Sequence, residues 1–234
     1  MGEQEPATEH PFGYAVRVSV MQGSLFGTGE LEIRAGASVN RTWLDDECWI
    51  DEIHGWLGGQ MELYERLARA DVWHRATRPM YGEMVEEPRL SAGMRVHDPR
   101  TPAIVRRMSD SLARRYDVPM NGLWLNWYRS GDDAVAWHAD RIGRAYKDPP
   151  VAIVSLGSTR RFQLRPKGGG PSTTFTPAGG DLLVMGGACQ HRWEHQVPRS
   201  RHGGARISVT FRPLAAKAED REDWAPGRSI RSAR

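Results

Sequence analysis

The chain has little cysteine and no long apolar run, and both shortages narrow the classes of protein to which it can belong. Its only two cysteines, Cys48 and Cys189, are too few for a disulfide framework and do not form a CxxC motif. No stretch of about 18 consecutive apolar residues exists, so no membrane-spanning helix is expected. The N-terminus, MGEQEPATEH, lacks the basic-then-apolar order of a signal peptide, and Pro6 stands where a myristoylation motif needs Ser or Thr. These absences predict a soluble cytoplasmic protein with no membrane partner.

The composition is that of a protein with a modest core and a mild basic excess. Hydrophobic residues make up 39% of the chain, nine of them Trp, and the formal net charge is +3. The sequence pI is about 9.1. This balance permits a polyanionic partner such as nucleic acid, but it equally fits an ordinary soluble protein.

The chain shows no internal repeat and no strong linker, which favours one domain with loose ends. Residues 1–20 are polar without a clear period, and we expect a loose N-terminal arm. After Pro213 the sequence is charged and poor in apolar residues, so we expect a flexible tail over 214–234. A single domain is predicted over 21–213.

Helical spacing dominates the first half of this domain. One short strand is expected at Glu30–Arg34. A capping Asp followed by Trp49, Ile50, Ile53 and Trp56 predicts a helix over 45–56, which Gly58-Gly59 ends. Apolar residues at helical spacing predict two more helices, one starting near Met61 and one over Thr101–Tyr116 that opens with a Thr-Pro pair.

The segment from about 73 to 94 contains prolines and glycines and reads as an exposed, hairpin-like loop. Beyond Pro119, short β-rich stretches alternate with turn residues, which is typical of a sandwich or barrel over about 120–213. The predicted strands are Gly122–Tyr128, Val135–Ala139, Val151–Leu156, Arg161–Arg165, Ser172–Thr176, Leu182–Met185, Arg192–Gln196 and Ala205–Phe211.

The segment Leu123–Asp140 carries the first chemical motif, because it ends in His138-Ala139-Asp140. Side chains one residue apart on a strand point to the same face, so this pair makes two-thirds of a facial 2-His-1-carboxylate iron site. His191, His195 and His202 are downstream candidates for the third ligand. We prefer His195, because it lies in an extended segment that would hold a ligand more rigidly. A histidine beside an acid is also common without any metal.

A second motif lies in Arg206-Ile207-Ser208-Val209-Thr210-Phe211-Arg212. On one strand Arg206, Ser208 and Arg212 share a face, and inward-pointing arginines are costly unless an anion neutralises them. A dicarboxylate would do so, since arginine pairs well with carboxylates. The alternation fits equally well a strand whose arginines face solvent and whose Ile, Val and Phe face the core.

Taken in order, the HxD, the later His and the Arg-x5-Arg strand resemble the AlkB-like 2-oxoglutarate- and Fe(II)-dependent dioxygenases, the nucleic-acid oxidative demethylases. The resemblance covers roughly residues 80–213. Asn126-x-Tyr128 is similar to the N-x-Y strand of the family, and RISVTFR to its R-x-N-L-T-F-R motif. Ser155-Leu156-Gly157 and the segment Gly180–Met185 also match.

The resemblance implies a mainly β (α+β) fold, a double-stranded β-helix or jelly roll with N-terminal helices and a nucleotide-recognition lid at about 73–94. It implies Fe(II) as the metal, with 2-oxoglutarate and O2 as cosubstrates. The implied iron ligands are His138, Asp140 and His195. The implied 2-oxoglutarate-binding residues are Asn126, Tyr128, Arg206, Ser208 and Arg212, with Arg206 at the distal carboxylate.

The implied reaction is oxidative demethylation of N-alkylated bases of the 1-methyladenine and 3-methylcytosine type in DNA, with release of formaldehyde, succinate and CO2. A base must leave the stack to reach a buried iron, so Tyr81 is a candidate wedge and Arg89 a phosphate or base contact. Both could instead be ordinary hairpin residues. A basic cluster could follow a phosphate backbone, or be a solvated face: Arg141, Arg144, Lys147, Arg160, Arg161, Arg165 and Lys167.

Two departures from the family leave the substrate open. Ile142 stands where several members carry an acid that reads the base, and Ser208 replaces the Asn of the arginine strand. The same chemistry on tRNA or other RNA, on protein or on a small molecule is therefore an alternative, and a non-catalytic jelly-roll binding module is another. We expect a monomer.

Overall fold

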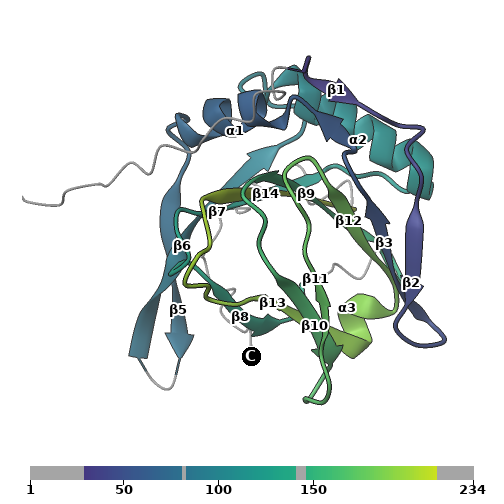
Figure 1. The fold of residues 1–234 in the computed structure, drawn as a ribbon, viewed down its shortest axis with the longest axis vertical. Coiled ribbons are helices and arrows are strands. Elements are labelled where there is room, and N and C mark those ends of the chain that lie inside the picture. The colour runs from purple at the N-terminus through teal and green to yellow at the C-terminus, as the bar shows by residue number, and fades with distance from the viewer. Residues whose placement is uncertain (1–28, 81–82, 141–145, 215–234) are drawn as a thin grey trace, which may run out of the picture.

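The computed structural model describes residues 29–80, 83–140 and 146–214. Within these ranges two facing sheets form the body of the molecule, and helices cover one side of it (Figure 1). The predicted arm at 1–20 and all but Leu214 of the predicted tail lie outside the described residues, as do Tyr81, Arg141 and Ile142. The single-domain division stays a prediction.

The larger sheet has eight strands and runs from an N-terminal edge to the β5–β6 hairpin. In spatial order its strands are β2 (Asn40–Trp43), β3 (Cys48–Ile53), β12 (Leu182–Gly187), β9 (Val151–Gly157), β14 (Arg206–Arg212), β7 (Gly122–Tyr128), β6 (Glu83–Arg95) and β5 (His74–Met80).

The smaller sheet has four strands and faces the larger one across the interior of the molecule (Figure 1). Its strands are β11 (Thr173–Phe175), β10 (Phe162–Pro166), β13 (Trp193–Val197) and β8 (Val135–His138), and the short helix α3 (Cys189–Arg192) precedes β13. A separate two-stranded pair joins β1 (Glu32–Ile33) to β4 (Leu57–Gly58). Two facing antiparallel sheets formed by a chain that crosses repeatedly between them are a double-stranded β-helix, as predicted.

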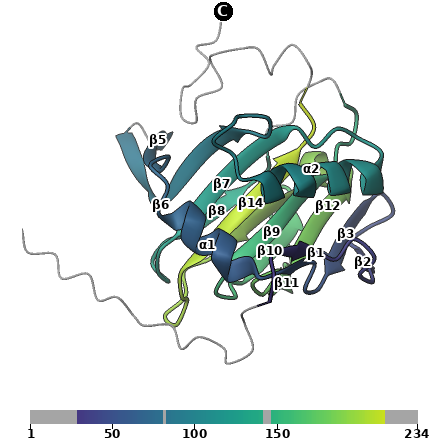
Figure 2. The same ribbon diagram turned by 90° about the horizontal axis from the view of Figure 1, so that it is seen from above.

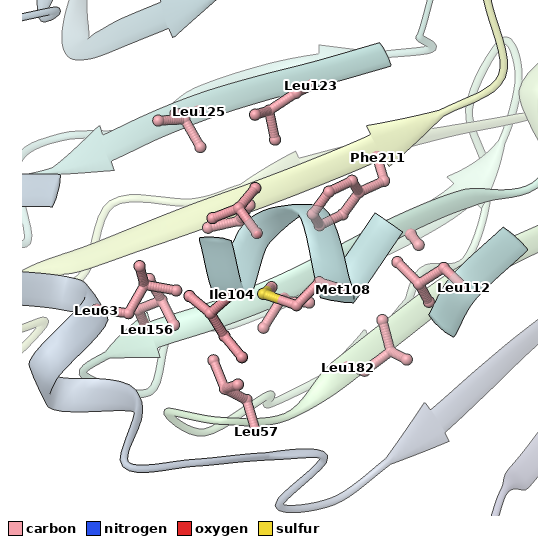
Figure 3. Packing of buried hydrophobic residues seen from close by; sticks show 14 of the residues in the cluster. Leu57, Leu63, Ile104, Met108, Leu112, Leu123, Leu125, Leu156, Leu182 and Phe211 are labelled. Atoms are coloured by element: carbon pink, nitrogen blue, oxygen red, sulfur yellow. The ribbon is translucent and has the colours of Figure 1, made fainter. Parts of the chain in front are cut away.

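Helices α1 (Gln60–Ala68) and α2 (Ala103–Tyr116) cover the outer face of the larger sheet (Figure 2). Their apolar stripes pack onto the sheet through Leu63, Met108 and Leu112, which meet Leu125 and Phe211 (Figure 3). These side chains are almost completely buried. Both helices were predicted from this spacing, and the first core therefore lies between helices and sheet.

A second core fills the space between the two sheets. Along β9, Ala152 and Val154 face the helices, whereas Val151 and Ile153 face the smaller sheet. Period-two alternation in which both faces are buried explains why this strand reads as a continuous apolar run.

The helix predicted over 45–56 is wrong: this segment is strand β3, between β2 and β12. Its apolar residues lie on both faces of the sheet, so Trp49 and Ile53 pack on the helix side while Ile50 packs inside. A short run buried on both sides hides the period of two, and the spacing of its apolar residues also fits a helix. Asp51 is buried here and accepts two hydrogen bonds from Arg41, at 2.6 and 2.8 Å.

The segment 73–94 is less loop-like than predicted. It forms the long antiparallel hairpin β5–β6, and the second half of β6 pairs with β7 inside the larger sheet. Ala92 and Ser91 are buried there, at 0% and 1% exposure. The end of β5 and the start of β6 extend away from the body of the molecule (Figure 1).

The eight strands predicted after Pro119 are all present, with ends within two residues of the prediction. In the described part of the chain, no helix is long and apolar enough to cross a membrane.

Candidate metal centre and cosubstrate pocket

Three residues with metal-binding side chains meet on the inner face of the smaller sheet. His138 on β8 and His195 on β13 are opposite each other in the strand register, and Asp140 follows β8 directly. The rings of His138 and His195 have centroids 4.3 Å apart, and His195 Nε2 lies 3.8 Å from Asp140 Oδ2. One ligand atom from each residue lies within 4.8 Å of the others. Two imidazoles and a carboxylate at this spacing fit a facial iron site.

Neighbouring groups hold these ligands in orientation. His138 Nδ1 is 2.8 Å from the carbonyl oxygen of Ala136, which can only accept, so Nδ1 carries the proton and Nε2 has the free lone pair. The Asp140 backbone N–H donates to Gln190 Oε1 at 3.1 Å. Phe162 stacks on the His195 ring, with centroids 5.2 Å apart. The site is therefore organised before any metal binds.

The charge state of these groups suits metal binding. Burial, reinforced by the electrostatic interaction with His138, lowers the pKa of His195 to about 3, so its imidazole is neutral at physiological pH. Burial alone would raise the pKa of Asp140, but electrostatic interactions with His195 and Arg212 outweigh burial and hold that pKa below its usual value. A neutral imidazole and an ionised carboxylate are the forms that coordinate a metal.

The arginine strand β14 is buried on both of its faces, which decides between the two sequence interpretations. Ile207 and Val209 pack towards the helices, while Arg206, Ser208 and Thr210 face the interior at 1%, 4% and 8% exposure. The interpretation in which the arginines face solvent is therefore wrong, because neither face of the strand is exposed. The inner face of this strand is a polar wall inside the protein.

Arg206 on that wall lacks an anionic partner. Its Nη2 donates to Ser155 Oγ at 2.9 Å, its Nε has no hydrogen-bond partner, and no carboxylate of the described residues forms an ion pair with it. Burial lowers its pKa to about 10, so it remains a cation. A buried guanidinium that is left unpaired is costly, and the donor set fits the carboxylate of a ligand.

Strand β7 completes the wall beside β14. Tyr128 pairs in register with Arg206, and Asn126 with Ser208. Three groups donate to Asn126 Oδ1, namely Arg89 Nε at 2.9 Å, Ser91 Oγ at 3.1 Å and Trp124 Nε1 at 3.2 Å. The amide NH2 of Asn126 is thus the end that can donate to a ligand.

At the other end of β14, Arg212 Nη1 lies 4.0 Å from Asp140 Oδ1. The arginine wall therefore reaches from the interior to the metal-binding cluster.

The residues predicted to contact nucleic acid have varied locations. Arg89 is 4% exposed, pairs with Glu87 at 3.0 Å, and its charge acts on Asp140, so it lies inside near the metal-binding cluster and not on an outer surface. Arg161 is exposed. Arg165 pairs with Glu194 at 2.6 Å, and its guanidinium carbon lies 4.2 Å from the centroid of the Trp137 ring.

Sequence reasoning missed several residues of the site. Gln190 and Ser91 support Asp140 and Asn126, and Arg160 was assigned to a basic surface although it is buried at 2% exposure. Adjacent arginines at 160 and 161 carry no sequence signal that says which one points inward.

A family model described as the 2OG-Fe(II) oxygenase superfamily matches residues 63–212. Among curated proteins, alpha-ketoglutarate-dependent dioxygenase alkB homolog 3 of Bos taurus is 29% identical over 65% of this chain and 60% of its own length. DNA oxidative demethylase ALKBH2 of Homo sapiens is 28% identical over 82% of this chain and 79% of its own length. The chain spans only 51% of the human alkB homolog 3, about half the length of that relative.

Solved structures share the fold at low identity. The structure of OsALKBH1 has a TM-score of 0.56 at 15% identity and covers 75% of this chain and 100% of its own. A prolyl hydroxylase from Trichoplax adhaerens, solved with a peptide fragment of hypoxia inducible factor, has a TM-score of 0.55 at 13% identity over 73% of this chain and 85% of its own.

Proposed function

The chain belongs to the 2OG-Fe(II) oxygenase superfamily, and on that premise we propose that it is a dioxygenase that oxidatively demethylates N-alkylated nucleobases in DNA. Bases of the 1-methyladenine and 3-methylcytosine type are the proposed substrates. The observation that carries the proposal is the His138–Asp140–His195 cluster beside the buried, unpaired Arg206. The cluster supplies the donor atoms that suit Fe(II), and Arg206 supplies a buried cation that an anionic cosubstrate can pair with.

His138 Nε2, His195 Nε2 and a carboxylate oxygen of Asp140 are the proposed iron ligands. The bound Fe(II), with 2-oxoglutarate and O2, would supply the oxidising chemistry that hydroxylates an N-methyl group, which then leaves as formaldehyde. The protein's part is orientation. The Ala136 carbonyl fixes the His138 tautomer, and Gln190 fixes the backbone at Asp140.

The inner faces of β7 and β14 are the proposed 2-oxoglutarate site. Arg206 would pair with the distal carboxylate beside Tyr128, since that guanidinium lies deepest and has a free donor. Asn126 and Arg212 would serve the keto-acid end near the metal. Ser208 lies between the two arginines on the same face, where its hydroxyl can donate to the cosubstrate.

The β5–β6 hairpin is the proposed lid over the substrate. It extends from the body of the molecule (Figure 1), and Met84 near its tip is 66% exposed. An apolar or aromatic side chain can fill the gap that a flipped base leaves in the stack, the role proposed for Tyr81. Arg89, buried near the metal-binding cluster, is proposed to contact the base, and Arg141 and Arg161 the phosphate backbone.

DNA is favoured over the other substrates because the ALKBH2 relative, named a DNA oxidative demethylase, aligns over most of both chains. The same chemistry on RNA is the second candidate, and Ile142 is the observation behind it, since the base-reading acid of several family members is absent there. A monomeric state and a cytoplasmic location stay predictions.

A panel of methylated oligonucleotides tests this proposal. Single- and double-stranded DNA and RNA carrying 1-methyladenine or 3-methylcytosine are incubated with Fe(II), 2-oxoglutarate and ascorbate, and formaldehyde is measured. We expect formaldehyde release from the methylated DNA oligonucleotides and none from unmethylated DNA of the same sequence. Release from RNA alone would favour the second candidate. No release from any nucleic acid, with iron and 2-oxoglutarate still bound, would exclude both.

A further inference from the structure

Arg160, in the turn between β9 and β10, is almost completely enclosed at 2% exposure. Its guanidinium donates to three backbone carbonyls: Nη1 to Ser130 at 2.8 Å, and Nη2 to Asp133 at 2.8 Å and to Pro198 at 3.1 Å. Its Nε has no hydrogen-bond partner in the described part of the chain. A planar fork with several donors can bridge carbonyls in this way, whereas a lysine cannot reach all three.

The three carbonyls belong to two segments that Arg160 joins. Ser130 and Asp133 lie in the loop that follows β7, and Pro198 lies just after β13. The loops approach so closely that a Cβ on Gly131 would lie 1.7 Å from the Ser200 carbonyl oxygen, and one on Gly203 would lie 3.0 Å from Arg160 Nε. The close loops and the three hydrogen bonds together hold the guanidinium of Arg160 in place.

Arg160 also contacts the cosubstrate pocket. Its Cζ lies 5.5 Å from the centroid of the Tyr128 ring, and Arg206 Cζ lies 5.6 Å from the same centroid. The ring that is proposed to sit beside 2-oxoglutarate thus has two guanidinium groups against it. The charge of Arg160 acts on Arg206, adding to the effect of burial in lowering its pKa.

Two buried cations against the same ring, each within the other's electrostatic reach, disfavour each other and favour an anion beside them. The Asp133 carboxylate offsets part of the charge of Arg160, but it is itself bound by Arg129 at 2.8 Å. Arg206 has no such acid. The anion that relieves this excess positive charge must therefore come from a ligand at Arg206.

We propose that Arg160 is a positioning residue for 2-oxoglutarate, which fixes the Tyr128 ring and the loop after β7 and adds positive charge behind Arg206 at the distal carboxylate. The inference rests on the proposed cosubstrate site. It assigns to Arg160 a role in binding affinity and not in the reaction itself, since its guanidinium is occupied by backbone carbonyls.

The test measures ligand binding in the whole protein with Mn(II) in place of iron, so that no turnover occurs. Isothermal titration calorimetry compares wild type, Arg160→Met and Arg160→Lys for two ligands, 2-oxoglutarate and 2-oxobutyrate, which lacks the distal carboxylate. Arg69→Met is the matched control, because Arg69 is an exposed arginine at the end of α1.

We expect Arg160→Met to weaken 2-oxoglutarate binding at least about tenfold, because it removes a buried charge near a carboxylate site. Binding of 2-oxobutyrate and of Mn(II) should change less than about threefold, and Arg160→Lys should recover part of the loss. In turnover, KM for 2-oxoglutarate should rise while kcat at saturation stays near wild type.

Equal weakening for both 2-oxo acids would show a merely structural role and overturn the proposal, as would wild-type affinity in Arg160→Met. If Arg160→Met does not fold, Arg160→Lys decides by the same comparison, the loss of affinity for 2-oxoglutarate against that for 2-oxobutyrate. Wild type that binds no 2-oxoglutarate would instead refute the proposed function, so the two failures are distinct.

Discussion

The two faces of strands β7 and β14 differ completely in chemistry, although successive residues of the same two strands form both faces. The outer face, towards α1 and α2, carries Leu123, Leu125, Ile207, Val209 and Phe211, all buried in one apolar cluster. The inner face carries Asn126, Tyr128, Arg206, Ser208 and Arg212, of which Arg206 and Ser208 are buried without a carboxylate in direct contact.

This difference teaches that residues for stability and residues for the proposed function alternate along the same strands, one set on each face. Apolar burial on the outer face stabilises the fold. The inner face does the reverse, because it buries Arg206, a cation that forms no ion pair with a carboxylate of the described residues. Substitutions on the two faces should therefore have opposite consequences, which Phe211 on the outer face and Arg206 on the inner face can test.

The largest expected effect is at the metal-binding cluster. Asp140→Ala removes the only carboxylate of the His138–Asp140–His195 group, and we expect both iron binding and turnover to be lost. Iron content and formaldehyde release measure this, with the exposed Asp110→Ala on α2 as control. Full activity in Asp140→Ala would contradict the assigned ligand set.

On the outer face, Phe211→Ala should reduce the free energy of unfolding by about 3–5 kcal/mol, because the ring is completely buried against the helices. Urea unfolding measures the loss. The comparison predicts that the protein that remains folded binds 2-oxoglutarate as wild type does. A large loss of affinity together with unchanged stability would reverse the assignment of the two faces.

On the inner face, Arg206→Met should weaken 2-oxoglutarate binding at least about 30-fold, since truncating one partner of a buried charge pair costs roughly 2 kcal/mol or more. Without ligand, the same substitution should leave stability unchanged or raise it, by up to about 4 kcal/mol, because it removes an unpaired buried charge. Calorimetry and urea unfolding measure the two effects. Strong destabilisation of the ligand-free protein would argue that Arg206 is a structural residue.

The smallest expected effect is at His54, which lies on neither face of β7 or β14. His54, just after β3, has its pKa raised above 6.5 because its Nδ1 hydrogen-bonds Asp181 Oδ2 at 3.0 Å. A raised pKa means that protonated His54 stabilises the fold below its unfolded pKa and that this contribution is lost as pH rises through the folded value.

The side chain of His54 is 68% exposed, so solvent screening limits the contribution to less than about 0.5 kcal/mol. We expect His54→Gln to remove a slight fall in Tm between about pH 6 and about pH 8. An unchanged pH dependence would show that the pair contributes nothing measurable.

The sequence predicted the jelly-roll strands well because Gly, Pro and Asp separate them, and the helices α1 and α2 because each has one apolar face against the sheet. It failed at β3, where Ile53 and Ile50 are buried on opposite faces and the alternation of apolar and polar residues is lost. The HxD and arginine motifs identified candidate residues. These motifs could not show whether the arginine face of β14 is buried or exposed, because the alternation is the same in either case. In the structure both faces of the strand are buried.

Arg160 and Arg161 show the limit most clearly. The two are adjacent and identical in type, yet one is enclosed by three carbonyls and the other is exposed. That outcome depends on where the loops after β7 and β13 meet, which is set by contacts distant in sequence.

The most direct test of the inner-face site is a crystal structure of the protein with Fe(II) and 2-oxoglutarate, grown without oxygen, with anomalous diffraction at the iron edge. We predict a single iron peak within bonding distance of His138, Asp140 and His195, and a dicarboxylate that chelates it and reaches Arg206. Iron bound elsewhere, or 2-oxoglutarate bound away from the inner faces of β7 and β14, would contradict the account.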